Sequence, residues 1–118
     1  MKLRDILPLI EGELLSGNAN LDLEVEMGCG ADLMSDVLAF THAGTLLVTG
    51  LTNPQVVRTA EMAEIAAIVF VRGKRPPEET IALAEEKGIP LLFSPHTMFE
   101  VCGRLYQAGM HGCGRFDL

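Results

Sequence analysis

The residues from Arg72 to Arg75 have the side chains to bind an anion. The stretch VRGKRPPEET, residues 71–80, places a glycine turn with three basic side chains between an apolar run and a helix-like segment. A strand, a glycine turn and a helix amino end form a common phosphate site, because unpaired backbone N–H groups and the helix dipole converge there. The first question is therefore whether this turn holds a phosphate.

Two features beside the turn argue against a phosphate cradle. Pro76 and Pro77 have no backbone N–H, so two donors are missing. Glu78 and Glu79 then place negative charge at the positive end of the helix dipole. The stretch also lacks the P-loop pattern, which has two glycines around four residues and then Lys-Ser or Lys-Thr. A solvated turn whose basic side chains pair with nearby acids is the simpler interpretation.

A shallow polar site at the carboxyl ends of the predicted strands is the better candidate. In an open parallel sheet, ligands bind beyond these ends, which here are TGLTNP, VRGKR and SPHT. The candidate ligand-binding residues are Asp36, Gly50, Thr52, Asn53, Arg72, Gly73, Lys74, Ser94, His96 and Thr97. The competing interpretation is that Thr52, Asn53 and Thr97 only cap helices.

The cysteines and one histidine are the other residues with chemical potential. Cys102, His111 and Cys113 are possible metal ligands, but a structural zinc site needs four ligands in recognisable pairs, and no CxxC is present. Cys29 ends a predicted strand, where packing is the simpler role. Because three cysteines make an odd number, we expect reduced thiols. We predict no catalytic set, metal or cofactor, and keep a metal or redox role as an alternative.

Alternating strands and helices must position these residues. The pattern predicts a short, interrupted helix from Leu3 to Ile10, a short strand in GELLSGN, and a half-buried edge strand over 21–29. The next segment, SDVLAF, is predicted as a helix capped by Ser35 or Asp36. Three buried strands are predicted in TLLVTG, AIVFV and PLLFS. A helix is predicted to follow each of them, starting at Asn53-Pro54, at PEET and at the capping box Thr97-x-x-Glu100. This order predicts an α/β fold of three layers, with a parallel or mixed sheet between helices.

Length and composition set the outer limits. A chain of 118 residues is long enough for one domain, which we place at 1–110, with a flexible glycine-rich tail at 111–118. A net charge of −7 argues against nucleic-acid binding. No apolar run reaches the roughly 18–20 residues of a membrane span, and the amino terminus lacks a signal-peptide core, so we expect a cytoplasmic protein.

The ordered segments resemble the DRTGG domain family. The resemblance is carried by Asp-Leu-x-Ser-Asp-Val-Leu at 32–38, Gly-x-x-Pro at 73–76, Ala-Glu-Glu-Lys-Gly-Ile-Pro at 84–90, and the amino-terminal LRDILPLIEGELLSG. It implies a fold similar to the amino-terminal domains of HPr kinase/phosphorylases and Mur ligases. Stand-alone members resemble small proteins of iron-only hydrogenase gene clusters, and some are called serine kinases. Here Arg72-Gly73-Lys74 replaces the expected Thr-Gly-Gly-like turn, and the P-loop for ATP is absent.

We therefore expect a non-catalytic regulatory or interaction module, a homodimer that senses a small anionic, nucleotide-like ligand. Its apolar composition, with a mean hydropathy of +0.28, favours self-association. One alternative is a phosphotransferase using Asp36, Arg72, Lys74 and His96. Another is a metal or redox accessory protein using the cysteines and His111, with an unidentified protein partner.

Overall fold

A mixed sheet organises the part of the chain that the structure, a computed structural model, describes, namely residues 1–16 and 19–114. The strands are β1 (Glu13–Leu14), β2 (Met27–Gly30), β3 (Thr45–Thr49), β4 (Ala67–Phe70) and β5 (Leu91–Phe93). Their order across the sheet is β1-β5-β4-β3-β2. Strands β2 to β5 are parallel, and β1 pairs antiparallel with β5. The sheet and the edge position predicted for β2 are confirmed.

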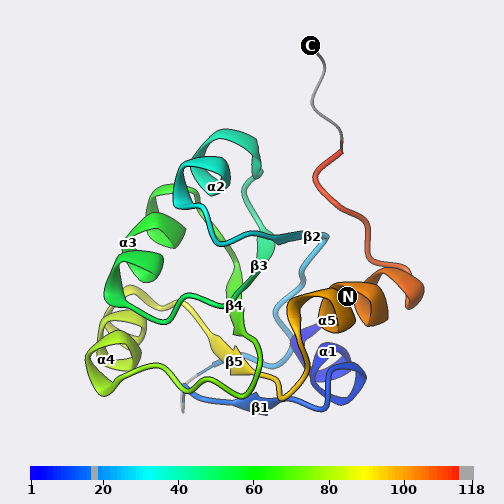
Figure 1. Cartoon of the computed structure of the whole chain (residues 1–118), viewed down its shortest axis with the longest axis horizontal. Coiled ribbons are helices and arrows are strands. Elements are labelled where there is room, and N and C mark those ends of the chain that lie inside the picture. Colours follow the sequence, from blue (N-terminus) through cyan, green and yellow to red (C-terminus); the bar gives the residue numbers. More distant parts are fainter. Residues whose placement is uncertain (17–18, 115–118) are drawn as a thin grey trace.

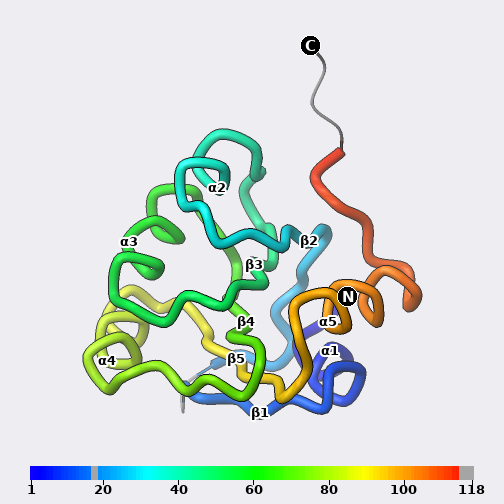
Figure 2. Tube along the Cα trace, viewed as in Figure 1, coloured from blue at the N-terminus to red at the C-terminus, as the bar shows by residue number. Residues whose placement is uncertain are grey.

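Helices cover both faces of this sheet (Figure 1). One face carries α2 (Met34–Phe40), α3 (Pro54–Met62) and α4 (Glu78–Lys87), and the other carries α1 (Leu3–Leu9) and α5 (Met98–Gln107). Figure 2 shows how the first third of the chain, in blue, runs from α1 through β1 and on to β2 at the opposite edge of the sheet. The predicted three-layer α/β fold is confirmed.

The inner strands are apolar on both faces because helices lie on both sides. Leu46 and Val48 of β3 belong to the core cluster beneath α1 and α5, whereas Leu47 belongs to the cluster beneath α2, α3 and α4. All five residues of β3 and all four of β4 are buried. The two core strands hold the loops at their carboxyl ends in fixed positions.

Two local predictions were wrong. The strand expected over 21–29 is regular only in β2, because the residues before it bond to the amino terminus: Leu3 N donates to Leu23 O at 3.2 Å and Val25 N to Met1 O at 2.8 Å. The α2 helix begins after Leu33 without a side-chain cap, so neither Ser35 nor Asp36 caps it. Asp36 lies instead in its first turn.

The carboxyl-terminal segment begins packed against β2. Gly28 N donates to His111 O at 2.9 Å, and Cys113 Sγ lies 3.6 Å from Thr45 Oγ1. Residues 115–118 of the predicted tail lie outside the described residues, and the domain boundary at 110 stays a prediction. Within the described ranges, no helix has the length and apolarity needed to cross a membrane.

Candidate ligand site at the carboxyl ends of the strands

Asp32 joins the ends of β2 and β3. It follows β2 by two residues, and its Oδ1 accepts hydrogen bonds from Thr49 Oγ1 at 2.9 Å and from Gly50 N at 2.8 Å. The Asp32 carboxylate thus binds the neighbouring strand end rather than capping α2, which has no side-chain cap. This contact fixes the turn that leads from β3 to α3.

Arg72 lies across the same turn. A Cβ placed on Gly50 would meet the Arg72 Nη2 atom at 2.8 Å, so the guanidinium rests directly on the Gly50 backbone. Gly50 is buried, and Arg72 itself is exposed. A side chain at position 50 would require the guanidinium to move, which the exposed end of a flexible arginine side chain can do.

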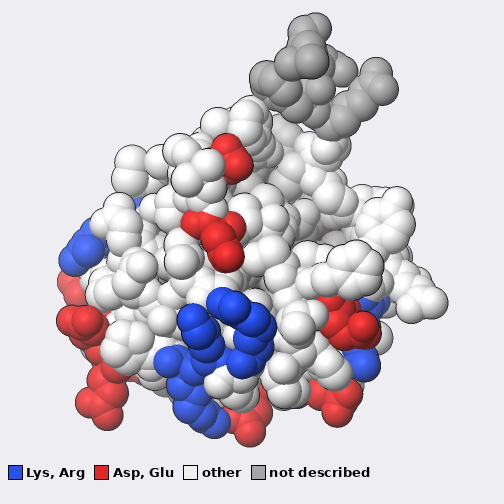
Figure 3. All heavy atoms as spheres, viewed as in Figure 1, with Lys and Arg blue, Asp and Glu red and all other residues white. Residues whose placement is uncertain are grey.

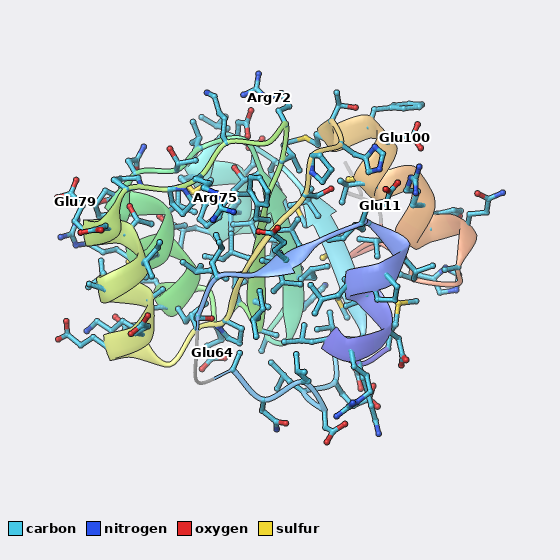
Figure 4. All side chains as sticks on the ribbon, turned by 90° about the horizontal axis from the view of Figure 1, so that it is seen from below. Glu11, Glu64, Arg72, Arg75, Glu79 and Glu100 are labelled. Carbon is cyan, nitrogen blue, oxygen red and sulfur yellow. The ribbon has the colours of Figure 1, made fainter. Side chains whose placement is uncertain are left out.

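Arg72 is available to an outside anion. Among the residues that the structure describes, no carboxylate forms an ion pair with Arg72 or Lys74, whereas Arg75 pairs with Glu13 at 2.7 Å. Figure 3 looks onto this end of the molecule and shows the basic side chains gathered over the loop between β4 and α4. In Figure 4, Arg72 lies at the carboxyl ends of the strands and Glu64 at their amino ends.

The backbone of the Arg72 turn is already used. Arg72 N donates to His96 O at 2.7 Å, Gly73 N to Ser94 O at 3.0 Å, and Lys74 N to Val71 O at 3.3 Å. Arg72 and Gly73 both have left-handed backbone angles, with φ of 61° and 66°. The turn therefore binds the β5 loop rather than cradling a phosphate, and any anion must be held by side chains.

The three candidate residues after β5, which are Ser94, His96 and Thr97, all have partners within the fold. Ser94 is fully buried, and its hydroxyl donates to Ile10 O at 2.7 Å and accepts from His96 N at 3.2 Å. The His96 ring contacts Glu11 Oε1 through Nε2 at 2.9 Å, on the side of α1 and α5. Thr97 caps α5 by accepting from Glu100 N at 3.4 Å. The structure thus directs these three side chains away from Arg72.

The residues after β3 are partly structural as well. Asn53 is the residue before α3, with Pro54 at the first helical position, as predicted, but its side chain makes no capping hydrogen bond. Thr52 O accepts from Thr80 Oγ1 at 2.8 Å, which ties this loop to α4. Asp36 is exposed on α2. Of the ten predicted residues, Gly50 and Arg72 are shown in mutual contact, and Gly73 and Lys74 continue the same turn.

Sequence reasoning missed Asp32 and Thr49. Their hydrogen bonds connect residues 17 positions apart, and only the parallel pairing of β2 with β3 brings them together. The family resemblance rested partly on the stretch Asp-Leu-x-Ser-Asp-Val-Leu, which begins with Asp32, but nothing in that stretch indicates that Asp32 binds Thr49. The exposed Arg72 guanidinium lies over the buried Gly50, whose backbone N–H donates to the Asp32 carboxylate.

The thiols form no comparable site. Burial raises the pKa of the Cys102 thiol, and burial together with the neighbouring Cys113, Cys102 and Asp36 charges raises that of Cys29. Raised pKa values leave less thiolate at neutral pH. Within residues 1–16 and 19–114, no group of three or more His, Cys, Asp or Glu side chains is arranged to hold a metal ion.

Comparison with known proteins places the chain in a family. No curated protein shows significant similarity to the sequence. A solved structure with the same fold is the crystal structure of the CBS and DRTGG domains of the regulatory region of Clostridium perfringens pyrophosphatase, complexed with its activator diadenosine tetraphosphate. The TM-score is 0.76 at 18% identity, and the match covers 91% of this chain and 46% of that one.

This chain therefore spans less than half the length of that regulatory region. The model of the DRTGG domain family matches residues 5–108, nearly the whole of the folded part. The order of strands and helices, the packed loops at the carboxyl ends and this match lead to one conclusion. The chain belongs to the DRTGG domain family.

Proposed function

We propose that this chain is a non-catalytic regulatory module that binds a small anionic, nucleotide-like ligand at the carboxyl ends of β3 and β4. One observation carries the proposal: the Arg72 guanidinium lies over Gly50, is exposed, and has no acidic partner among the described residues. Arginine is well suited to phosphate because its planar fork donates two parallel hydrogen bonds. Lys74, exposed on the same turn, adds a second cation.

The comparison supports a regulatory role. The similar solved structure comes from the regulatory region of an enzyme and holds diadenosine tetraphosphate, a phosphate-rich activator. Because the two chains share 18% identity, that likeness shows the fold, and the ligand class is part of our proposal. A homodimer, which the apolar composition favours, and an accessory role in an iron-only hydrogenase system, which the family resemblance implies, belong to the same proposal.

A phosphotransferase remains the second candidate, and the geometry favours it less. Its proposed residues Asp36, Arg72, Lys74 and His96 do not converge, because the His96 ring is bound to Glu11 beside α5. The backbone N–H groups of Arg72, Gly73 and Lys74 already donate within the fold, so they are not available to hold a transferred phosphoryl group. Incubation with γ-labelled ATP should therefore give no labelled protein or product.

A ligand titration of the full chain tests the proposal. The probes are diadenosine tetraphosphate, ATP, AMP and inorganic phosphate. Their binding is measured by thermal unfolding and by calorimetry. A ligand that binds only the folded state stabilises it by about 2.7 kcal/mol at a hundredfold excess over its Kd. We expect a saturable shift with at least one nucleotide, and a Kd at least tenfold weaker in Arg72→Ala.

Arg58→Ala is the matched control. Arg58 is exposed on α3 and, among the described residues, has no ion pair. Arg58→Ala therefore changes the net charge by the same amount as Arg72→Ala and leaves the candidate site unaltered. Equal loss of binding in the two variants would show only a general charge effect. No binding of any probe to the unmodified chain would overturn the proposal.

A further inference from the structure

The outer side of α5 carries an exposed aromatic stripe. Phe99 is 87% exposed and Tyr106 is 67% exposed, while Val101 and Leu105 on the opposite side are buried. Phe99, Cys102, Gly103 and Tyr106 are spaced i, i+3, i+4 and i+7, so they line one side of the helix. We call these four residues the α5 stripe. Exposed aromatic side chains at this spacing are typical of a contact surface.

The stripe has a shape that can pack against a second helix. A shallow hollow of about 620 Å³ lies along it, lined by the stripe together with Glu100, Arg104 and Gln107. At Gly103 an added Cβ would have nothing within 4 Å, so the centre of the stripe is open. Small residues at a crossing point allow two helix backbones to approach closely.

The order of side chains along the stripe is nearly symmetric. Reading in either direction gives a large aromatic, two small residues and a large aromatic. Two copies packed antiparallel would therefore set Phe99 of one copy against Tyr106 of the other at both ends, with Cys102 and Gly103 at the crossing. An isologous two-fold contact requires a self-complementary surface of this kind.

Charge on this helix suits a second copy of the chain. The whole chain has a net charge of −7, which repels another copy over most approaches. Helix α5 contains one acid, Glu100, and one base, Arg104, so its net charge is zero. Glu100 and Arg104 pair with each other at 3.0 Å along the helix, so this surface presents a neutralised pair to a second copy.

We propose that two copies of this chain associate through the α5 stripe, with the two helices antiparallel. This inference rests on the homodimer included in the proposed function and assigns its interface. Interfacial membrane helices carry many Lys and Arg side chains on the polar face, whereas α5 carries one Arg, so an anionic membrane is a poor occupant. Four aromatic rings, at roughly 150–250 Å² each, would bury about 600–1,000 Å² in total, less than the roughly 1,200–2,000 Å² of a standard specific interface and typical of a weak one. We therefore expect a dimer of micromolar affinity.

Sedimentation equilibrium of the full chain between low and high micromolar concentration tests the interface. We expect a monomer–dimer equilibrium. Phe99→Asp, Tyr106→Asp and Gly103→Arg should each raise the dissociation constant of the dimer at least tenfold. Met62→Asp is the matched control, because Met62 is a 69% exposed apolar side chain on α3 and should leave the equilibrium unchanged. Circular dichroism confirms that each variant remains folded.

The outcomes separate this inference from the rest of the proposed function. A chain that is monomeric at all concentrations overturns both the homodimer and its interface. A dimer that survives all three stripe variants overturns the α5 assignment alone. Ligand binding is measured separately through Arg72 and does not depend on either result.

Discussion

Glu11 connects three elements through one carboxylate. It follows α1 with a left-handed backbone, φ of 51°, and its Oε1 contacts His96 Nε2 at 2.9 Å and Arg104 Nη1 at 3.6 Å. The hydrogen bond to His96 is the largest cause that lowers the pKa of Glu11, and the positive charges of His96 and Arg104 lower it further. Glu11 thus links α1 to the β5–α5 loop and to α5 (Figure 4).

This contact predicts a pH-dependent stability. Because the pKa of Glu11 is lower in the folded chain, its contribution is present above the unfolded value of about 4.3 and is lost as pH falls through the folded value. Urea unfolding should show that Glu11→Gln lowers the midpoint at pH 6 and has a smaller effect at pH 3.5. The control is Glu86→Gln, an exposed α4 residue without an ion pair among the described residues. An equal effect of Glu11→Gln at both pH values would contradict the assignment.

The candidate site shows what residue-level reasoning can predict. Arg72 was recognisable because a long cation follows a buried strand at the ligand-binding edge of a parallel sheet. Ser94 directly follows β5 at the same edge of the sheet, yet its hydroxyl is turned inward to Ile10 O. Asp32 was missed because its function depends on Gly50, across the sheet. Strand ends can be read locally, but the direction of a side chain is set by neighbours distant in sequence.

At the scale of elements, α5 packs on the bare backbone of β2. A Cβ on Gly30 would meet Cys102 Sγ at 2.8 Å, and one on Gly28 would meet Met110 Sδ at 2.9 Å. Gly30 therefore lets α5 approach the edge strand closely, and Gly28 makes room for Met110, which follows the helix. The strand predicted over 21–29 included Gly28 without indicating what lies against it, and it ended one residue before Gly30.

This contact predicts a specific pair of variants. Gly30→Ala should destabilise the fold by about 1–3 kcal/mol, the usual cost of overpacking, because Met98 lies beside Cys102 and limits relaxation. Cys102→Ala removes the clashing sulfur, so the double variant should recover most of that loss. Urea unfolding of the four proteins measures the coupling. Additive effects of the two substitutions would show that the close approach is not what requires glycine.

Elements with strong local signals were predicted well. From β3 to α5, buried strands alternate with helices, and the predicted helix starts at Asn53-Pro54 and Thr97 are confirmed. The segment before β2 has equally clear alternation, and Val25 is indeed buried. Its backbone nevertheless bonds to the amino terminus rather than to a strand. Periodicity predicts which side chains are buried more reliably than it predicts backbone partners.

At the scale of the whole molecule, charge separates the two proposed surfaces. The Arg72 turn is a cationic patch on a chain with a net charge of −7, and the α5 stripe is a neutral surface on the same chain. Ligand binding at Arg72 is an attraction between unlike charges. Self-association through α5 brings two negatively charged bodies together around an apolar contact.

The two surfaces should therefore respond to salt in opposite directions. The Debye length falls from about 10 Å at 0.1 M salt to about 3 Å at 1 M, so salt weakens attraction and repulsion between exposed charges alike. Sedimentation at low and high NaCl should show dimerisation strengthening several-fold, while calorimetry shows nucleotide binding weakening. Phe99→Asp should remain largely monomeric at both salt concentrations because it loses the apolar contact itself. Dimerisation that weakened with salt would mean that Glu100 and Arg104 across the interface, rather than the aromatic side chains, hold the two copies together.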